Sequence, residues 1–401
     1  MRGGGIARVR IDDRERRARL AVRHRLAPSA RAGGPLEVAR SLVALHATGA
    51  AAVYLAVRAR TGEVGVADVD RALFGERTLA RVLGMRRTVF VVPVELVPAV
   101  YGACTRTIAA RERRSLERLL VDGGICAAGA AEAWLRSAEA DALRALESRG
   151  EATAAELASD VPQLRQRLHF GQGRRWAGSQ GLSTRVLWVL AGDGRVVRGR
   201  PRGTWTSSQY RWAPFDRWLG SGVAELPVAD AQAELARCWL RAFGPGTARD
   251  LRWWAGWTVR DTARALAAVG AVEVELDGGA TGCALPDDLE AVEGPEPHAA
   301  FLPPLDSTVM GWKERAWYLG PHGPSLFDSA GNAGPTIWWD GRIVGGWGQD
   351  RAGRVAYRLL EDVGREAGPA IESEADRLDG WLRGARVTPS FRTPLERELA
   401  G

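Results

Sequence analysis

The sequence of 401 residues contains very little lysine, asparagine or cysteine. Lys313 is its only lysine and Asn332 its only asparagine, and both fall in one short C-terminal stretch. The cysteines lie far apart, at positions 104, 126, 238 and 283. No two of them have the spacing of a metal-binding or redox pair, so we expect buried free thiols and no metal site.

Long hydrophobic runs are also missing. No apolar stretch approaches the roughly 20 residues that span a bilayer, and residues 1–10 lack the apolar core of a signal peptide. These absences predict a cytoplasmic protein without a membrane contact. Apolar residues make up 46 % of the chain and charged residues 26 %, which is enough core material for two to four globular units.

Arginine, by contrast, is abundant. The chain has 55 Lys and Arg residues against 48 Asp and Glu, a formal net charge of +7. A GC-rich genome would explain the choice of arginine over lysine, but it does not explain the net excess. Because cationic side chains release condensed counterions when they meet phosphates, the excess favours a nucleic acid as the partner.

A recurring order of short helices and strands indicates the fold. It is clearest in residues 150–213, where Thr153 and Glu156 have the spacing of a helix capping box. A second helix, STRVLWVLAGDGR, ends in glycines, and VVRGRPRGTWTSSQYRW then predicts the β-hairpin, or wing, of a winged-helix unit. Residues 243–286 repeat this order. Residues 36–96 predict three helices, over 36–47, 50–60 and 66–83, before the strand RRTVFVVP.

The residue pattern changes after residue 290. Three β-branched or aromatic runs there predict strands, with turns at Asp340-Gly341 and Ala352-Gly353. We therefore predict an α+β protein with three tandem winged-helix (helix-turn-helix) units and a small β-rich C-terminal domain. The predicted boundaries are 1–35 (basic helix and linker), 36–149 (first unit with a helical extension), 150–220 (second unit), 221–290 (third unit), 291–366 (β-rich domain) and 367–401 (C-terminal helix and tail).

Several segments resemble the AlkZ/YcaQ-like family of tandem winged-helix proteins. They are LHATGAAAVYLAVRAR, MRRTVFVVP, the GRPRG wing, FLPPLD and IVGGW, and the resemblance extends over roughly residues 36–382. It implies a monofunctional DNA glycosylase that removes N3- or N7-alkylated purines, or crosslink adducts, from double-stranded DNA held in a basic channel. It implies neither a metal nor an organic cofactor, and we expect a monomer.

The catalytic signature of that family is Gln, an apolar residue, and then Gln or Asp, at the end of a helix. The matching residues here are His46, Ala47 and Thr48, so both polar positions differ. A cationic alkylated purine leaves readily, so the enzyme mainly has to position a water at C1′ and stabilise an oxocarbenium-like centre. His46 is the candidate base and Thr48 the candidate hydroxyl that holds the water. The structural alternative is a histidine satisfied at a helix C-terminus, with Thr48 capping the next helix.

Arginines of the predicted wing are the main candidates for DNA contacts. Arg198, Arg200 and Arg202 alternate along the hairpin, so their side chains should point to one side and reach phosphates or a minor groove. The remaining candidates are Arg195 and Arg211, which flank them, Arg86 and Arg87 at the start of the strand RRTVFVVP, and Lys313. Solvated positions and ordinary ion pairs are the alternatives.

Tyr54 and Asp306 are candidates for lining a pocket, and we expect Asp306 and Lys313 at the mouth of the β-rich domain. A Schiff base of Lys313 with an abasic sugar would add lyase activity, whereas a phosphate contact or an ion pair would not.

Two other functions fit the same residues. One is a non-catalytic DNA-binding protein or transcriptional regulator, which the His-Ala-Thr variant of the tripeptide favours. The other is a self-resistance protein that binds the adduct of a DNA-alkylating natural product. Several units in tandem argue against a typical repressor, which is one short winged helix that dimerises.

Overall fold

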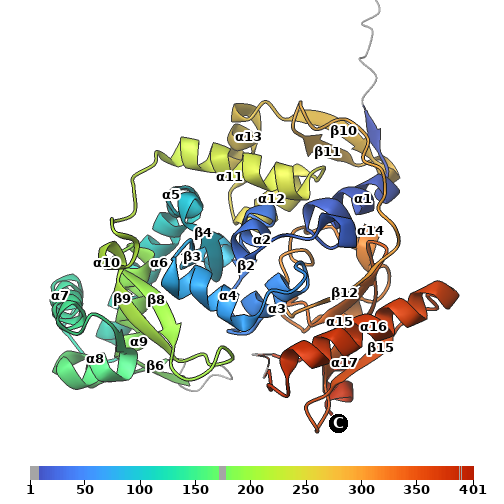
Figure 1. Ribbon diagram of the computed structural model, residues 1–401. Coiled ribbons are helices and arrows are strands. Elements are labelled where there is room, and N and C mark those ends of the chain that lie inside the picture. Colours follow the sequence, from blue (N-terminus) through green and yellow to red (C-terminus); the bar gives the residue numbers. More distant parts are fainter. Residues whose placement is uncertain (1–8, 171–177, 388, 390) are drawn as a thin grey trace, which may run out of the picture.

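The computed structural model describes residues 9–170, 178–387, 389 and 391–401 (Figure 1). Three units in it follow one order of elements: helix, strand, two helices, two strands. The first unit, residues 35–93, consists of α2 (Pro35–Ser41), β2 (Leu45–His46), α3 (Ala52–Arg58), α4 (Val66–Asp70), β3 (Leu79–Gly84) and β4 (Thr88–Pro93). Its sheet order is β2-β4-β3, so the first strand pairs with the last.

The second unit, residues 131–214, repeats this topology. Its elements are α7 (Ala131–Arg149), β5 (Ala152–Thr153), α8 (Ala154–Asp160), α9 (Leu182–Gly192), β8 (Val196–Pro201) and β9 (Tyr210–Pro214), and its sheet order is β5-β9-β8. A small hairpin of β6 (Arg167–Phe170) and β7 (Gly178–Gly181) lies between α8 and α9. The predicted capping box is confirmed, because Thr153 and Glu156 exchange hydrogen bonds at the start of α8.

The third unit, residues 228–284, contains α11 (Val228–Phe243), α12 (Ala248–Ala255), α13 (Val259–Ala268), β10 (Val272–Leu276) and β11 (Thr281–Ala284). A single bridge between Gly246 and Cys283 takes the place of its first strand. The short strand β1 (Arg10–Ile11), from the start of the described chain, adds to its sheet parallel to β10. The helices and strands predicted over 243–286 are confirmed.

The first unit differs from its prediction in two places. Helix α2 ends at Ser41, and Val43 takes a left-handed φ of 63° before β2 pairs with β4. The helix predicted over 66–83 ends in a π-helical turn at Arg71–Gly75, and the segment Leu79–Gly84 is the strand β3. Both predictions were wrong because strand pairing with a distant partner overrode a local helical pattern.

The C-terminal sheet has the order β12-β13-β14-β15, with strands Ala299–Leu302, Thr336–Trp339, Arg342–Gln349 and Val355–Leu359. Asp340 and Gly341 form the predicted tight turn, with φ of 45° and 75°. Helix α16 (Gly364–Leu382) packs on β12 and α17 (Pro394–Leu399) on β14. Helix α1 (Asp13–Arg23) precedes the first unit, α5 (Val97–Val100), α6 (Arg106–Asp122) and α10 (Phe215–Leu219) lie between units, and α14 (Ala316–Leu319) and α15 (Gly323–Leu326) lie between β12 and β13.

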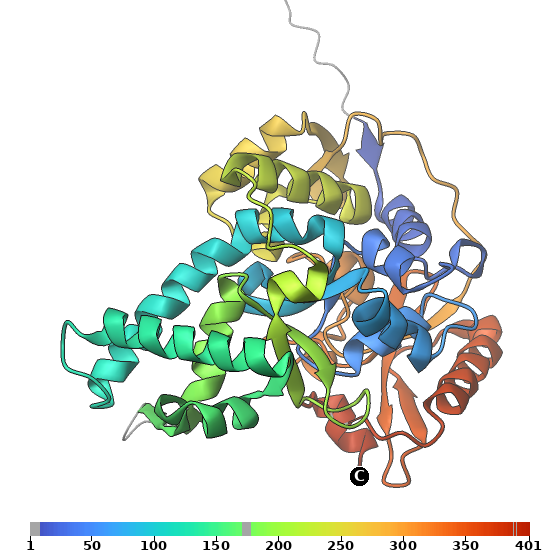
Figure 2. The same cartoon turned by 60° about the vertical axis from the view of Figure 1, so that its left-hand side comes forward.

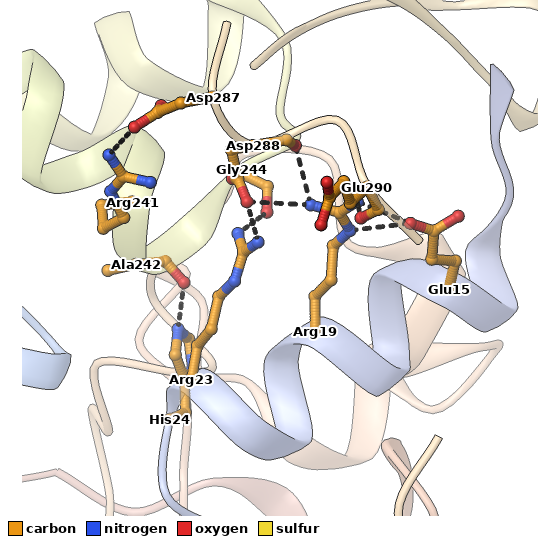
Figure 3. A network of polar contacts seen from close by, with 10 residues as sticks. All are labelled: Glu15, Arg19, Arg23, His24, Arg241, Ala242, Gly244, Asp287, Asp288 and Glu290. Carbon is orange, nitrogen blue, oxygen red and sulfur yellow. Dashed lines mark hydrogen bonds and ion pairs between the residues drawn. The ribbon is translucent and has the colours of Figure 1, made fainter. Parts of the chain in front are cut away.

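The predicted basic N-terminal helix, α1, packs against residues of the third unit and of the segment that follows it. Arg19 donates to the main-chain oxygens of Asp288 (3.0 Å) and Glu290 (2.6 Å), and Arg23 pairs with the Asp288 carboxylate at 2.6 Å (Figure 3). His24 lies 3.0 Å from the carbonyl of Ala242 at the end of α11. These arginines hold α1 against the third unit.

The first unit lies between the second unit, the third unit and the C-terminal sheet (Figures 1 and 2). One continuous apolar core joins it to the third unit and to the C-terminal sheet, while the second unit has a core of its own. The α+β class is confirmed. None of the helices in the described ranges is long and apolar enough to cross a membrane.

Candidate active site

The predicted catalytic tripeptide lies at the end of β2, not at the end of a helix. His46 faces Phe90 in the antiparallel pairing with β4, and the Ala47 N–H donates to the carbonyl of Val89 at 2.9 Å. Just before the tripeptide, the Ser307 hydroxyl donates to the carbonyl of Ala44 at 2.6 Å. The main chain from Ala44 to Ala47 is therefore held by hydrogen bonds to β4 and to Ser307.

The His46 side chain is only 6 % exposed and meets the Phe90 ring edge-on at 5.0 Å. Its Nδ1 is buried and has no hydrogen-bond partner among the described residues. Burial, with the positive charge of Arg86 as a second cause, lowers the pKa of His46 to about 3. The imidazole is therefore neutral at physiological pH, and it is a weak base because burial and Arg86 both disfavour its protonated form.

The two other predicted residues near the tripeptide have different surroundings. Thr48 is exposed in the loop after β2. Tyr54 is 1 % exposed, donates its hydroxyl to Asp70 at 2.6 Å and packs against Trp205. Burial and the Asp70 carboxylate raise the pKa of Tyr54 above its usual value. Tyr54 is thus a core residue at the junction of the first unit with the β8–β9 loop.

Arg81, on β3, is a further residue at this site. Its Nη1 donates to the Tyr210 hydroxyl at 2.7 Å and to the carbonyl of Ala47 at 3.3 Å, and its guanidinium lies 4.4 Å from the Tyr210 ring centroid. A helix predicted over residues 66–83 gave no reason to expect Arg81 beside the tripeptide. Correct assignment of β3 would have placed this arginine on a strand beside the tripeptide.

Arg86 and Arg87 lie in the turn between β3 and β4, both with left-handed φ. Arg86 stacks over Trp253 of α12 at 3.9 Å, and burial together with the charge of Arg315 lowers its pKa to about 10. Arg87 points elsewhere and pairs with Glu112 at 2.6 Å. Only Arg86 therefore contributes to the electrostatics at His46.

The hairpin arginines do not form one solvated row. Arg198 is half-buried among aromatic rings, Arg200 pairs with Asp70 at 2.9 Å, and the register shifts between Arg198 and Pro201. Arg202 is exposed at the hairpin tip. Of the flanking pair, Arg195 is exposed and Arg211 lies 3.9 Å from Glu156.

The prediction that Asp306 lies at the mouth of the β-rich domain was wrong. It forms a bidentate pair with Arg60, at 2.6 and 3.0 Å, and both side chains are fully buried. Lys313 is exposed, and its backbone N–H donates to Asp250 at 2.9 Å. Within the described ranges, no three His, Cys, Asp or Glu side chains gather as metal ligands do.

The sequence of residues 39–381 matches the family model of the AlkZ-like DNA glycosylases. The chain belongs to this family. It is a family of DNA-binding repair proteins, and the predicted resemblance is thereby confirmed. The matched range contains the tripeptide at 46–48 and every other candidate site residue named above.

The solved structure of Streptomyces sahachiroi DNA glycosylase AlkZ is similar to this chain with a TM-score of 0.70 and 19 % sequence identity. The similarity covers 96 % of this chain and 99 % of the other, so the whole fold is shared. No curated protein sequence matches this chain.

Proposed function

We propose that this chain is a monofunctional glycosylase that removes N3- or N7-alkylated purines, or crosslink adducts, from double-stranded DNA by attack of water at C1′. The observation that carries the proposal is the place of His46: it is the first residue of the tripeptide by which the chain resembles the family, its main chain pairs with Phe90 of β4, and its imidazole Nδ1 has no partner among the described residues. The DNA substrate itself follows from the family.

The order of helices and strands that the three units share supports the scaffold that this function needs. A helix, a strand, two helices and a two-stranded hairpin paired to the first strand make up a winged-helix unit. We propose that all three units are winged helices and that the β8–β9 hairpin is a wing.

The chemistry asks little of the protein. When the N-glycosidic bond breaks, its electron pair neutralises the alkylated purine, and the water oxygen then bonds to C1′. Once its oxygen is bonded to C1′, the former water is a strongly acidic oxonium, and it passes a proton to the neutral, weakly basic imidazole of His46. The exposed Thr48 hydroxyl orients the water before attack. Because the leaving base is already cationic, no protein acid is needed for its departure.

The test is incubation of the protein with duplex DNA that carries a single N7-alkylguanine or N3-alkyladenine, followed by quantification of abasic sites. Release of the modified base above the spontaneous rate is expected. Tight binding without release of any adduct would contradict the glycosylase proposal and favour a non-catalytic DNA-binding protein. The burial of His46 and the changed tripeptide are compatible with that alternative.

The pH profile of the reaction provides a second prediction. Since the folded-state pKa of His46 is about 3, the neutral form persists on acidification, and the single-turnover rate should stay level from about pH 8 down to about pH 5. A histidine with its ordinary pKa near 6.5 would instead lose rate about tenfold per unit below that value. Rates are measured at saturating protein and corrected for spontaneous base loss. A midpoint near pH 6.5 would show either that another group accepts the proton or that the pKa of His46 is not lowered, and both outcomes contradict the prediction.

A further inference from the structure

A cavity of about 310 Å³ lies between the start of α8, the start of α9 and the β8–β9 hairpin. Its lining includes Thr153, Thr184, Arg198, Arg202, Gln209 and Tyr210. The cavity therefore joins three elements of the second unit at the base of its wing.

Arg198 is the distinctive group of this cavity. Its guanidinium carbon lies 5.1 Å from the Trp212 ring centroid and 5.5 Å from those of Trp188 and Tyr210. In the part of the chain that the structure describes, this guanidinium has no hydrogen bond and no ion pair. Aromatic faces attract a cation but satisfy none of its five N–H donors in the plane of the guanidinium. A half-buried charge with free donors is a group prepared for an anion.

The other lining groups agree with this charge. The described residues around the cavity include no carboxylate, whereas they include a second cation, Arg202, and the polar groups of Thr184, Ser208 and Gln209. Glu156, which follows the lining residues Thr153–Ala155 in the chain, is engaged by Thr153 and Arg211. A cationic alkylated base would be repelled by two arginines, so charge favours a phosphate over the damaged base.

The cavity adjoins the catalytic tripeptide. Tyr210 lines the cavity, its hydroxyl accepts from Arg81 at 2.7 Å, and the same Arg81 nitrogen lies 3.3 Å from the carbonyl of Ala47. One side chain thus separates the cavity wall from the main chain between His46 and Thr48. A phosphate bound here belongs to the DNA strand close to the nucleotide under attack.

We propose that this cavity binds a single phosphodiester group of the DNA next to the target nucleotide, through Arg198 and Arg202, and so sets the register of the strand against His46. This inference rests on the proposed function in one respect, that DNA is the ligand, and it does not require that a base is excised. The wing then contributes one specific contact near the reaction centre in addition to general attraction to the duplex.

The test uses a duplex with a central tetrahydrofuran abasic analogue, which binds without reacting. A neutral methylphosphonate replaces one phosphate at a time on either side of the analogue, and Kd is measured at fixed salt for the wild type and for Arg198→Gln. We expect one flanking position at which the substitution weakens wild-type binding about tenfold, as loss of a charge-assisted pair does. Arg198→Gln should weaken binding to the unmodified duplex by a similar factor and be insensitive to methylphosphonate at that position.

Two further variants keep the test decisive. Arg202→Gln changes an exposed side chain and should show the same insensitivity, so it replaces Arg198→Gln if that variant has a lowered thermal midpoint. Arg144→Gln removes an exposed arginine of α7 that pairs with Asp141, and it should retain the wild-type pattern. Two outcomes would overturn the proposal. In one, the methylphosphonate weakens binding of both cavity variants by the same factor as it weakens wild-type binding. In the other, its effect is equal at every position. Absence of base release with the expected binding pattern would contradict the glycosylase and leave the cavity assignment standing.

Discussion

His46→Ala should lower the single-turnover rate of base excision by about 10² to 10⁴, which is the usual contribution of a positioned proton acceptor. Affinity for duplex DNA should change little, because His46 is 6 % exposed and its neutral ring offers no charge to a phosphate. The measurement is the release of N7-alkylguanine at saturating protein, with Kd determined separately on the abasic analogue.

Two companion variants distinguish chemistry from folding. His46→Gln restores the residue type that the family resemblance implies at this position, so it should keep much of the activity. His169→Ala removes an exposed imidazole from β6 and should match the wild type. A wild-type rate in His46→Ala would place the catalytic group elsewhere, and equal losses in the Ala and Gln variants with lowered thermal midpoints would indicate a packing role.

Asp306→Ala should lower the free energy of unfolding by about 3–5 kcal/mol, the cost of leaving one partner of a buried ion pair uncompensated. Arg60 would remain fully buried, with the carbonyls of Ala56 and His24 and the Thr308 hydroxyl as its remaining partners. The effect is large because this pair joins the end of α3 to the loop after β12, across the main core. The loss is measured by urea or thermal denaturation, from the unfolding transition that includes the first unit.

The matched control is Glu398→Ala, which breaks an exposed pair with Arg358 at the edge of the C-terminal sheet. Side chains in such pairs are about half exposed, and water screens their attraction, so the loss should stay below about 1 kcal/mol. Losses of similar size in the two variants would show that Asp306 and Arg60 do not stabilise the junction as the geometry indicates.

Local signals in the sequence predicted much of this fold. The Thr153–Glu156 capping box and the Asp340-Gly341 turn both appear in the structure. Each depends on a hydrogen bond or a backbone angle within a few residues, so a short window of sequence contains the cause. The family resemblance, which follows from the same kind of short segments, was confirmed over residues 39–381.

The α+β class, the repeated order of helices and hairpins and the family could thus be predicted from the amino-acid sequence. Four features became known only from the folded chain: His46 ends a strand, Arg81 bonds to Ala47, Asp306 is buried with Arg60, and Arg198 lies among aromatic rings at a cavity. For His46, Arg81 and Asp306 the partner lies dozens to hundreds of residues away in the chain. For Arg198 the aromatic partners Trp188, Tyr210 and Trp212 come from neighbouring elements of the second unit. Burial and pairing with such partners set the charge and accessibility of a side chain, and no local pattern of residues contains that information.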